Sequence, residues 1–138
     1  MTVDALRSLV SSAIWRAEQL EDLGLETAPL AWTEVSRLEE ALAKLMPAKE
    51  PEGRIARRGA VRAALKANDL PRARDLVERY AGDGASRALR NEMREMMEAA
   101  AKGFSEEFPW AAKHYKPGDF QRLANLFWRR GPFSLAAA

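Results

Sequence analysis

Five cationic side chains recur along the stretch GRIARRGAVRAALKAND, residues 53–69. They are Arg54, Arg57, Arg58, Arg62 and Lys66. A helix advances about 100° per residue, so this spacing gathers the five cations on one side of a predicted helix. Guanidinium groups match the geometry of phosphate oxygens, and such a band can follow a nucleic-acid backbone. We therefore take this basic helix as the first candidate for nucleic-acid or partner binding.

Two aliphatic residues, Val61 and Leu65, fall inside the cationic band, whereas small Ala and Gly residues occupy the opposite side of the helix. The small side lets another helix approach closely. Three interpretations of the cations stay open: they pair with acids of neighbouring segments, they contact phosphates, or they surround an apolar centre that docks on an acidic protein groove. What covers Val61 and Leu65 distinguishes a solvated rim from a partner surface.

The C-terminal part of the chain combines aromatic residues with cations. Eight of the eleven aromatic residues lie between Phe104 and Phe133. Most of these rings suit the inner faces of helices, but Trp128, Arg129 and Arg130 stand directly before the helix-breaking GPF. Aromatic rings stack on bases while cations neutralise phosphates, so these three residues are the second candidate contact for nucleic acid or a partner.

Trp15 is a further candidate interface residue near the N-terminus. It lies about 180° around its predicted helix from Leu6, on the side opposite the apolar stripe of that helix. Either another helix covers Trp15, or this residue marks an interface.

Residues that support catalysis or metal binding are scarce. The chain has no cysteine, and its only histidine is His114. No glycine-rich phosphate loop, nucleophile elbow or histidine motif for zinc is present. The sequence therefore predicts that the protein is not an enzyme and binds no metal, cofactor or small-molecule substrate.

Charge is segregated along the chain although the net charge is only +2. Net charges of −5, +6, −3 and +4 belong to residues 1–53, 54–74, 75–107 and 108–138. The composition, 47% hydrophobic and 30% charged, is that of an ordinary globular protein. No apolar run is long enough to span a membrane, and the N-terminus lacks the pattern of a signal peptide, so a cytoplasmic location is predicted.

Helical periodicity runs through most of the chain, and no alternating strand pattern occurs. The expected helices cover residues 4–23, with Asp4 as N-cap, and then 33–46, 54–66, 71–81, 86–102, 109–115 and 119–130. The Pro-containing segment 47–53 is the expected linker between an acidic helical pair, 1–46, and the basic helix with the remaining bundle, 54–138. The predicted fold is all-α, a single domain with a compact bundle of about six to seven helices built from antiparallel helical hairpins.

These features predict a non-catalytic helical subunit or accessory factor of a larger complex, such as a ribonucleoprotein. Its basic helix and basic-aromatic C-terminal tail are expected to contact a nucleic-acid backbone, RNA or DNA. The alternative is a protein–protein adaptor or inhibitor that docks on a partner protein through the same surfaces, without nucleic acid.

Overall fold

Five α-helices make up the part of the chain that the structure, a computed structural model, describes, residues 1–107. They are α1 (Val3–Asp22), α2 (Ala28–Lys44), α3 (Pro51–Lys66), α4 (Leu70–Ala81) and α5 (Arg87–Glu107). No strand occurs among these residues, which confirms the all-α prediction. The helices predicted at 109–115 and 119–130 lie outside the described residues, so the total of six to seven stays a prediction.

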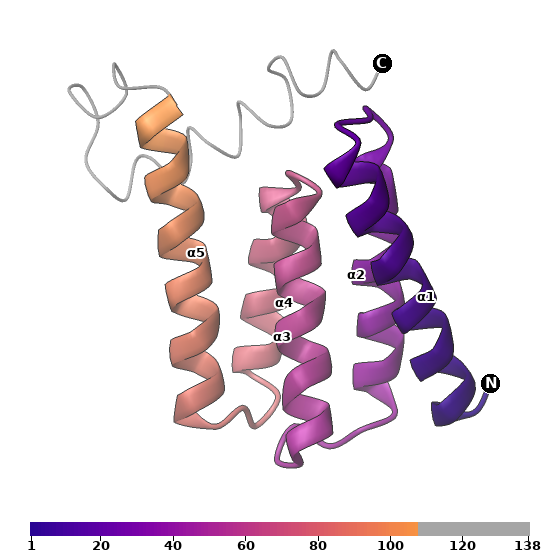
Figure 1. Cartoon of the computed structure of the whole chain (residues 1–138). Helices are drawn as coiled ribbons and strands as arrows, with labels where there is room; N and C mark the ends of the chain where they lie inside the picture. Colours follow the sequence, from indigo (N-terminus) through magenta and orange to yellow (C-terminus); the bar gives the residue numbers. More distant parts are fainter. Residues whose placement is uncertain (108–138) are drawn as a thin grey trace.

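The described helices lie side by side, with α1, α3 and α5 running in one direction and α2 and α4 in the other (Figure 1). Helix α2 packs against α1 and α3, and α3 also contacts α4 and α5. Helix α3 is therefore enclosed by three other helices, whereas α1 packs mainly on α2 at the edge of the array.

The ends of the helices follow local signals, with some corrections to the expected bounds. Thr2 caps α1 because its side-chain oxygen accepts a hydrogen bond from the amide of Ala5 at 3.1 Å. Asp4, expected to be the cap, lies instead in the first turn, where its charge favours the helix dipole. Helix α1 ends before Gly24, whose φ of +66° suits a residue without a side chain.

Proline and glycine account for other differences from the expected bounds. Helices α2 and α3 both begin with a proline in the first turn, where the missing amide hydrogen costs nothing. Helix α2 therefore starts at Ala28 rather than residue 33, and α3 takes in the last three residues of the expected linker. Helix α5 continues through Gly103 to Glu107 instead of ending near residue 102, because an isolated glycine weakens a helix without breaking it.

The core is built on small residues of α3. Ala60, Ala63 and Ala64 are each at most 2% exposed, which lets neighbouring helices approach α3 closely. Large side chains of α4 and α5, including Leu76 and Met93, fill the main core beside them. The Ala/Gly side of the basic helix thus packs as its sequence predicts.

Candidate interaction surfaces

The two aliphatic residues of the basic helix belong to the core. Val61 has no exposed surface, and Leu65 is partly buried against the same core cluster. Other helices of the same chain therefore cover these two residues, which is the outcome that favours a solvated rim over a partner surface with an apolar centre. Three helices surround α3, so even the side that carries the cations is partly enclosed.

Arg57 lies inside the protein rather than on the outer cationic band, which corrects the placement inferred from its helical angle. The residue is 5% exposed. Its guanidinium donates to the carbonyl oxygens of Met46 at 2.9 Å and Gly53 at 3.0 Å, and to the carboxylate of Asp83 at 3.1 Å. The same group lies 5.6 Å from the ring centre of Tyr80. Arg57 therefore joins α3 to the α2–α3 loop and to the α4–α5 loop.

Arg54 and Arg58 share one acidic partner on α5. Both guanidinium groups bind the carboxylate of Glu92, with a distance of 2.8 Å from Arg58. The Glu92 side chain is only 23% exposed. This arrangement neutralises part of the cationic charge within the protein, through an acid of the 75–107 segment.

Lys66 is held at the other end of α3 by an aromatic ring and an acid. Its ammonium lies 4.7 Å from the ring centre of Trp32 and 3.7 Å from a carboxylate oxygen of Glu21. The indole N–H of Trp32 donates to Glu21 at 2.7 Å. Sequence reasoning did not single out Trp32, although its position three residues before Val35 on the apolar stripe of α2 was a signal for burial.

Arg62 is the fifth cation of the basic helix. It is exposed, and among residues 1–107 it forms no ion pair within 4 Å. Its charge acts on Glu39, which is 7% exposed and packs against Gly59. Burial raises the pKa of Glu39 to about 7, although Arg62 opposes this shift. An acid at the α2–α3 contact is therefore partly protonated near neutral pH.

A polar network ties α2 to α3 and α4. The hydroxyl of Ser36 donates to the carbonyl oxygen of Ala60 at 2.7 Å and accepts from Arg72 at 3.0 Å. Arg72 and Arg79 donate to the Glu40 carboxylate at 2.8 Å and 2.7 Å. Burial by itself would raise the pKa of Glu40, but these hydrogen bonds outweigh burial and lower it. The network fixes side chains beside a surface cavity.

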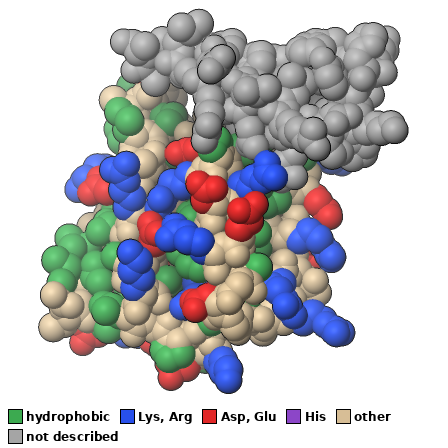
Figure 2. All heavy atoms as spheres, turned by 180° about the vertical axis from the view of Figure 1, so that it is seen from behind, with side chains coloured by type: hydrophobic (Ala, Val, Ile, Leu, Met, Phe, Trp, Pro, Cys, Tyr) green, Lys and Arg blue, Asp and Glu red, His purple; other side chains and the backbone are tan. Residues whose placement is uncertain are grey.

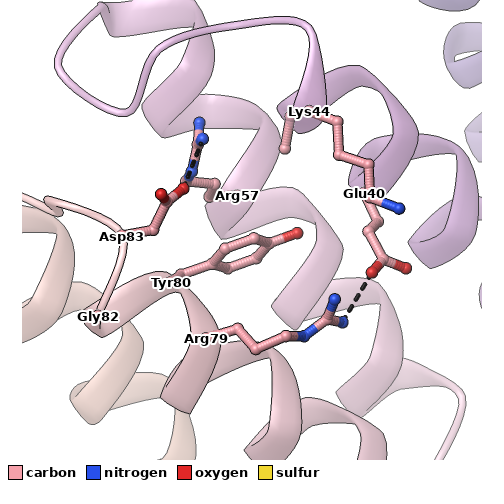
Figure 3. Close-up of a pocket in the computed structure, with 8 residues that line it drawn as sticks. Glu40, Lys44, Arg57, Arg79, Tyr80, Gly82 and Asp83 are labelled. Carbon is pink, nitrogen blue, oxygen red and sulfur yellow. Dashed lines mark hydrogen bonds and ion pairs between the residues drawn. The ribbon is translucent and has the colours of Figure 1, made fainter.

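This cavity, of about 470 Å³, lies where α2, α3 and the end of α4 meet (Figure 3). Its lining consists of Glu40, Ala43, Lys44, Arg57, Arg79, Tyr80, Gly82 and Asp83. The Tyr80 side chain reaches in from α4 with its hydroxyl toward α2 (Figure 3). Sequence analysis missed this site because its residues come from three separate segments, 40–44, 57 and 79–83, that only the tertiary fold brings together.

The outer side of α1 carries little charge between residues 5 and 15, where the one charged residue, Arg7, is half-buried and pairs with Asp4 and Glu52. From Ala5 to Trp15, every exposed residue is uncharged. They are Ala5, Ser8, Leu9, Ser11, Ser12 and Trp15, and together we call them the α1 face. Trp15 is 66% exposed, so the described part of the chain does not cover it. A shallow cavity of about 460 Å³ lies beside it, lined by Ser11, Ser12, Trp15 and Arg16.

Exposed apolar side chains concentrate in the first thirty residues. Of the eight exposed large hydrophobic residues in the described chain, six precede Ala31. The six are Met1, Leu9, Trp15, Leu23, Leu25 and Leu30. By contrast, Figure 2 shows Lys and Arg side chains intermixed with Asp and Glu on the side of the molecule turned away in Figure 1. The apolar surface is thus localised, whereas the charges on that side are mixed.

Several predicted features fall outside the described residues. Trp128, Arg129, Arg130 and His114 are among them, so their roles stay predictions. Within residues 1–107, no group of three or more potential metal ligands is close enough to hold an ion. No helix in the same part of the chain has the length and apolar character needed to cross a membrane.

Comparisons with models of protein families, with curated protein sequences and with solved structures found no match. The functional argument therefore depends on the chemistry of the surfaces themselves.

Proposed function

We propose that this chain is a non-catalytic helical subunit that docks on a partner protein through the α1 face. The observation that carries this proposal is the run of exposed, uncharged residues from Ala5 to Trp15, which ends at a tryptophan that is 66% exposed. Large exposed aromatic residues amid small neighbours are typical of interface centres.

The partner that fits this surface is an amphipathic helix. The small residues Ala5, Ser8 and Ser12 stand at helical spacing and fall within about 120° of Trp15 around the axis, so a second helix can approach α1 closely. Acidic residues such as Glu18 and Asp22 follow the face, and residues 1–53 carry a net charge of −5. The docking helix should therefore flank its apolar stripe with Lys and Arg.

Affinity purification of the full chain tests this proposal. Wild type is compared with Ser12→Arg, which places a long cation in the α1 face, and with Trp15→Ala. A partly exposed residue on α4, far from the α1 face in the sequence, gives the matched control, Arg74→Gln. We expect one stoichiometric protein that both α1 variants release and the control retains, and its binding segment to be a basic amphipathic helix. If all four proteins recover equal amounts of the partner, the proposal is refuted. If light scattering instead detects a dimer of this chain, and Ser12→Arg dissociates it, the partner of the α1 face is a second copy of the chain.

Nucleic-acid contact through the basic helix and the segment around Trp128 is the second candidate function. Arg62 is exposed, and the side chains of Arg58 and Lys66 on the same helix are 33% and 41% exposed. Binding of single- and double-stranded oligonucleotides should then weaken steeply as salt rises. Absence of binding at low salt would eliminate this function, whereas loss of binding in Arg58→Glu plus Arg62→Glu would support it.

Two finer expectations accompany the proposal. One is that the whole chain forms a bundle of six to seven helices assembled from antiparallel hairpins. A cytoplasmic location would give this face access to cytoplasmic protein complexes.

A further inference from the structure

The cavity between α2, α3 and α4 contains more cationic than acidic groups. Lys44, Arg57 and Arg79 line it together with two carboxylates, Glu40 and Asp83. Both carboxylates are already engaged, since Arg79 binds Glu40 at 2.7 Å and Arg57 binds Asp83 at 3.1 Å (Figure 3). Lys44 is exposed and forms no ion pair within the described part of the chain. The cavity therefore retains one cation whose charge is not balanced by its own lining.

The hydroxyl of Tyr80 is the second unsatisfied group. The residue is only 7% exposed, and its hydroxyl oxygen is buried without a hydrogen-bond partner among residues 1–107. Buried polar groups in native proteins nearly always have a partner, because leaving one unpaired is costly. The Tyr80 side chain projects from α4 into the space between Arg57 and Glu40 (Figure 3). A fixed hydroxyl thus faces a cavity with an unbalanced cation at its edge.

We propose that this cavity binds a small oxyanion, a phosphate or carboxylate group, which accepts a hydrogen bond from the Tyr80 hydroxyl and lies against the Lys44 ammonium. Arg79, whose side chain is 54% exposed, can turn one of its remaining N–H groups toward the same anion. The volume of about 470 Å³ accommodates a small molecule or one phosphate of a larger ligand.

The charges in the cavity favour an anion over a cation. A cationic ligand would face three cations while both carboxylates are held by arginines. Burial and, to a smaller extent, the nearby Glu40 raise the pKa of Tyr80 to about 12. The hydroxyl therefore keeps its proton at neutral pH and can donate it to an oxyanion. This site is independent of the α1 face and goes beyond partner docking.

Titration of the full chain with inorganic phosphate and with acetate tests the inference. The ionic strength is held constant with chloride, and the amide NMR signals of Gly82 and Asp83 report on the cavity. We expect saturable shifts, with a dissociation constant on the order of 1 mM for phosphate. Tyr80→Phe, which removes only the unpaired hydroxyl, should weaken phosphate binding about tenfold.

Two further variants separate this site from general charge effects. Lys44→Gln should weaken binding to a similar degree, whereas Arg37→Gln, which removes an exposed cation of α2 outside the cavity, should leave it unchanged. If a short single-stranded oligonucleotide binds with the same losses in Tyr80→Phe and Lys44→Gln, the oxyanion is a backbone phosphate. If only the free anions bind, the ligand is a small solute. Unsaturable shifts with every probe, or equal affinities of wild type and both cavity variants, would overturn the proposal.

Discussion

A comparison of helices α3 and α1 shows that the number of charged residues on a helix does not determine how much of its surface is free to bind a partner. Helix α3 carries five cations, yet Arg57 is buried and Arg54 and Arg58 both bind Glu92. Helix α1 has no exposed charged residue from Ala5 to Trp15, and its Trp15 is 66% exposed. The enclosed position of α3 lets four of its five cations bind partners within the described chain, whereas the edge position of α1 leaves the α1 face with its Trp15 uncovered. Position in the array therefore decides which surface can receive a partner.

Gly53 provides the strongest test of how closely α3 is enclosed. A methyl group added at this position would overlap the backbone carbonyl oxygen of Pro47. Gly53→Ala should therefore lower the free energy of unfolding by about 3 kcal/mol, as overpacking against backbone does. Ser8→Ala on the exposed α1 face is the control and should change it by less than about 0.5 kcal/mol. Urea unfolding measures both, and equal stabilities would mean that α3 has free space around it.

Arg57 and Arg62 differ in burial on the same helix, so their substitutions compare the inner and outer sides of α3. Arg57→Ala removes the donors to the carbonyl oxygens of Met46 and Gly53 and should cost about 2 kcal/mol of unfolding free energy. Arg62→Ala should cost less than about 0.5 kcal/mol, because an exposed cation contributes little. A larger effect at Arg62 than at Arg57 would contradict the assignment of Arg57 to the interior.

The buried Glu39 should make the α2–α3 contact sensitive to pH. Its pKa is raised from 4.5 to about 7 in the folded protein, so between these values the folded state holds a proton that the unfolded state has lost. The contribution to stability is complete below pH 4.5 and is lost as pH rises through about 7. Glu39→Gln, which stays neutral, should have a free energy of unfolding about 3 kcal/mol above that of wild type at pH 8.

Unfolding curves at pH 5 and pH 8 measure this effect. The difference in stability between Glu39→Gln and wild type should grow with pH. A constant difference would show that Glu39 is ionised in the folded protein.

Trp15 should contribute little to folding because most of its surface is exposed. Trp15→Ala should change the free energy of unfolding by less than about 0.5 kcal/mol, in contrast to substitutions at the centre of α3. Chemical denaturation followed by circular dichroism measures this value without relying on the indole signal. A loss of several kcal/mol would identify Trp15 as a core residue and remove it from the α1 face.

The helical class was predictable from the sequence because periodic apolar residues and proline or glycine signals are local. The burial of Val61 and Arg57 was not, since a helical angle defines a side of one helix but not which neighbours cover that side. The partners of Arg57 and Arg58 stand 26 and 34 residues away, at Asp83 and Glu92, and only the tertiary fold brings them together. Trp15 was identifiable because its angle opposes the apolar stripe of its own helix.

The affinity of the full chain for the isolated partner helix most directly tests whether the partner binds the α1 face or the cations of α3. Isothermal titration would compare wild type, Ser12→Arg, and Arg58→Gln plus Arg62→Gln. Docking on the α1 face predicts that Ser12→Arg weakens binding by at least about a hundredfold, while the double variant on α3 stays within about threefold of wild type. Unchanged binding of Ser12→Arg with loss of binding in the α3 variant would contradict the proposal and return the interface to the basic helix.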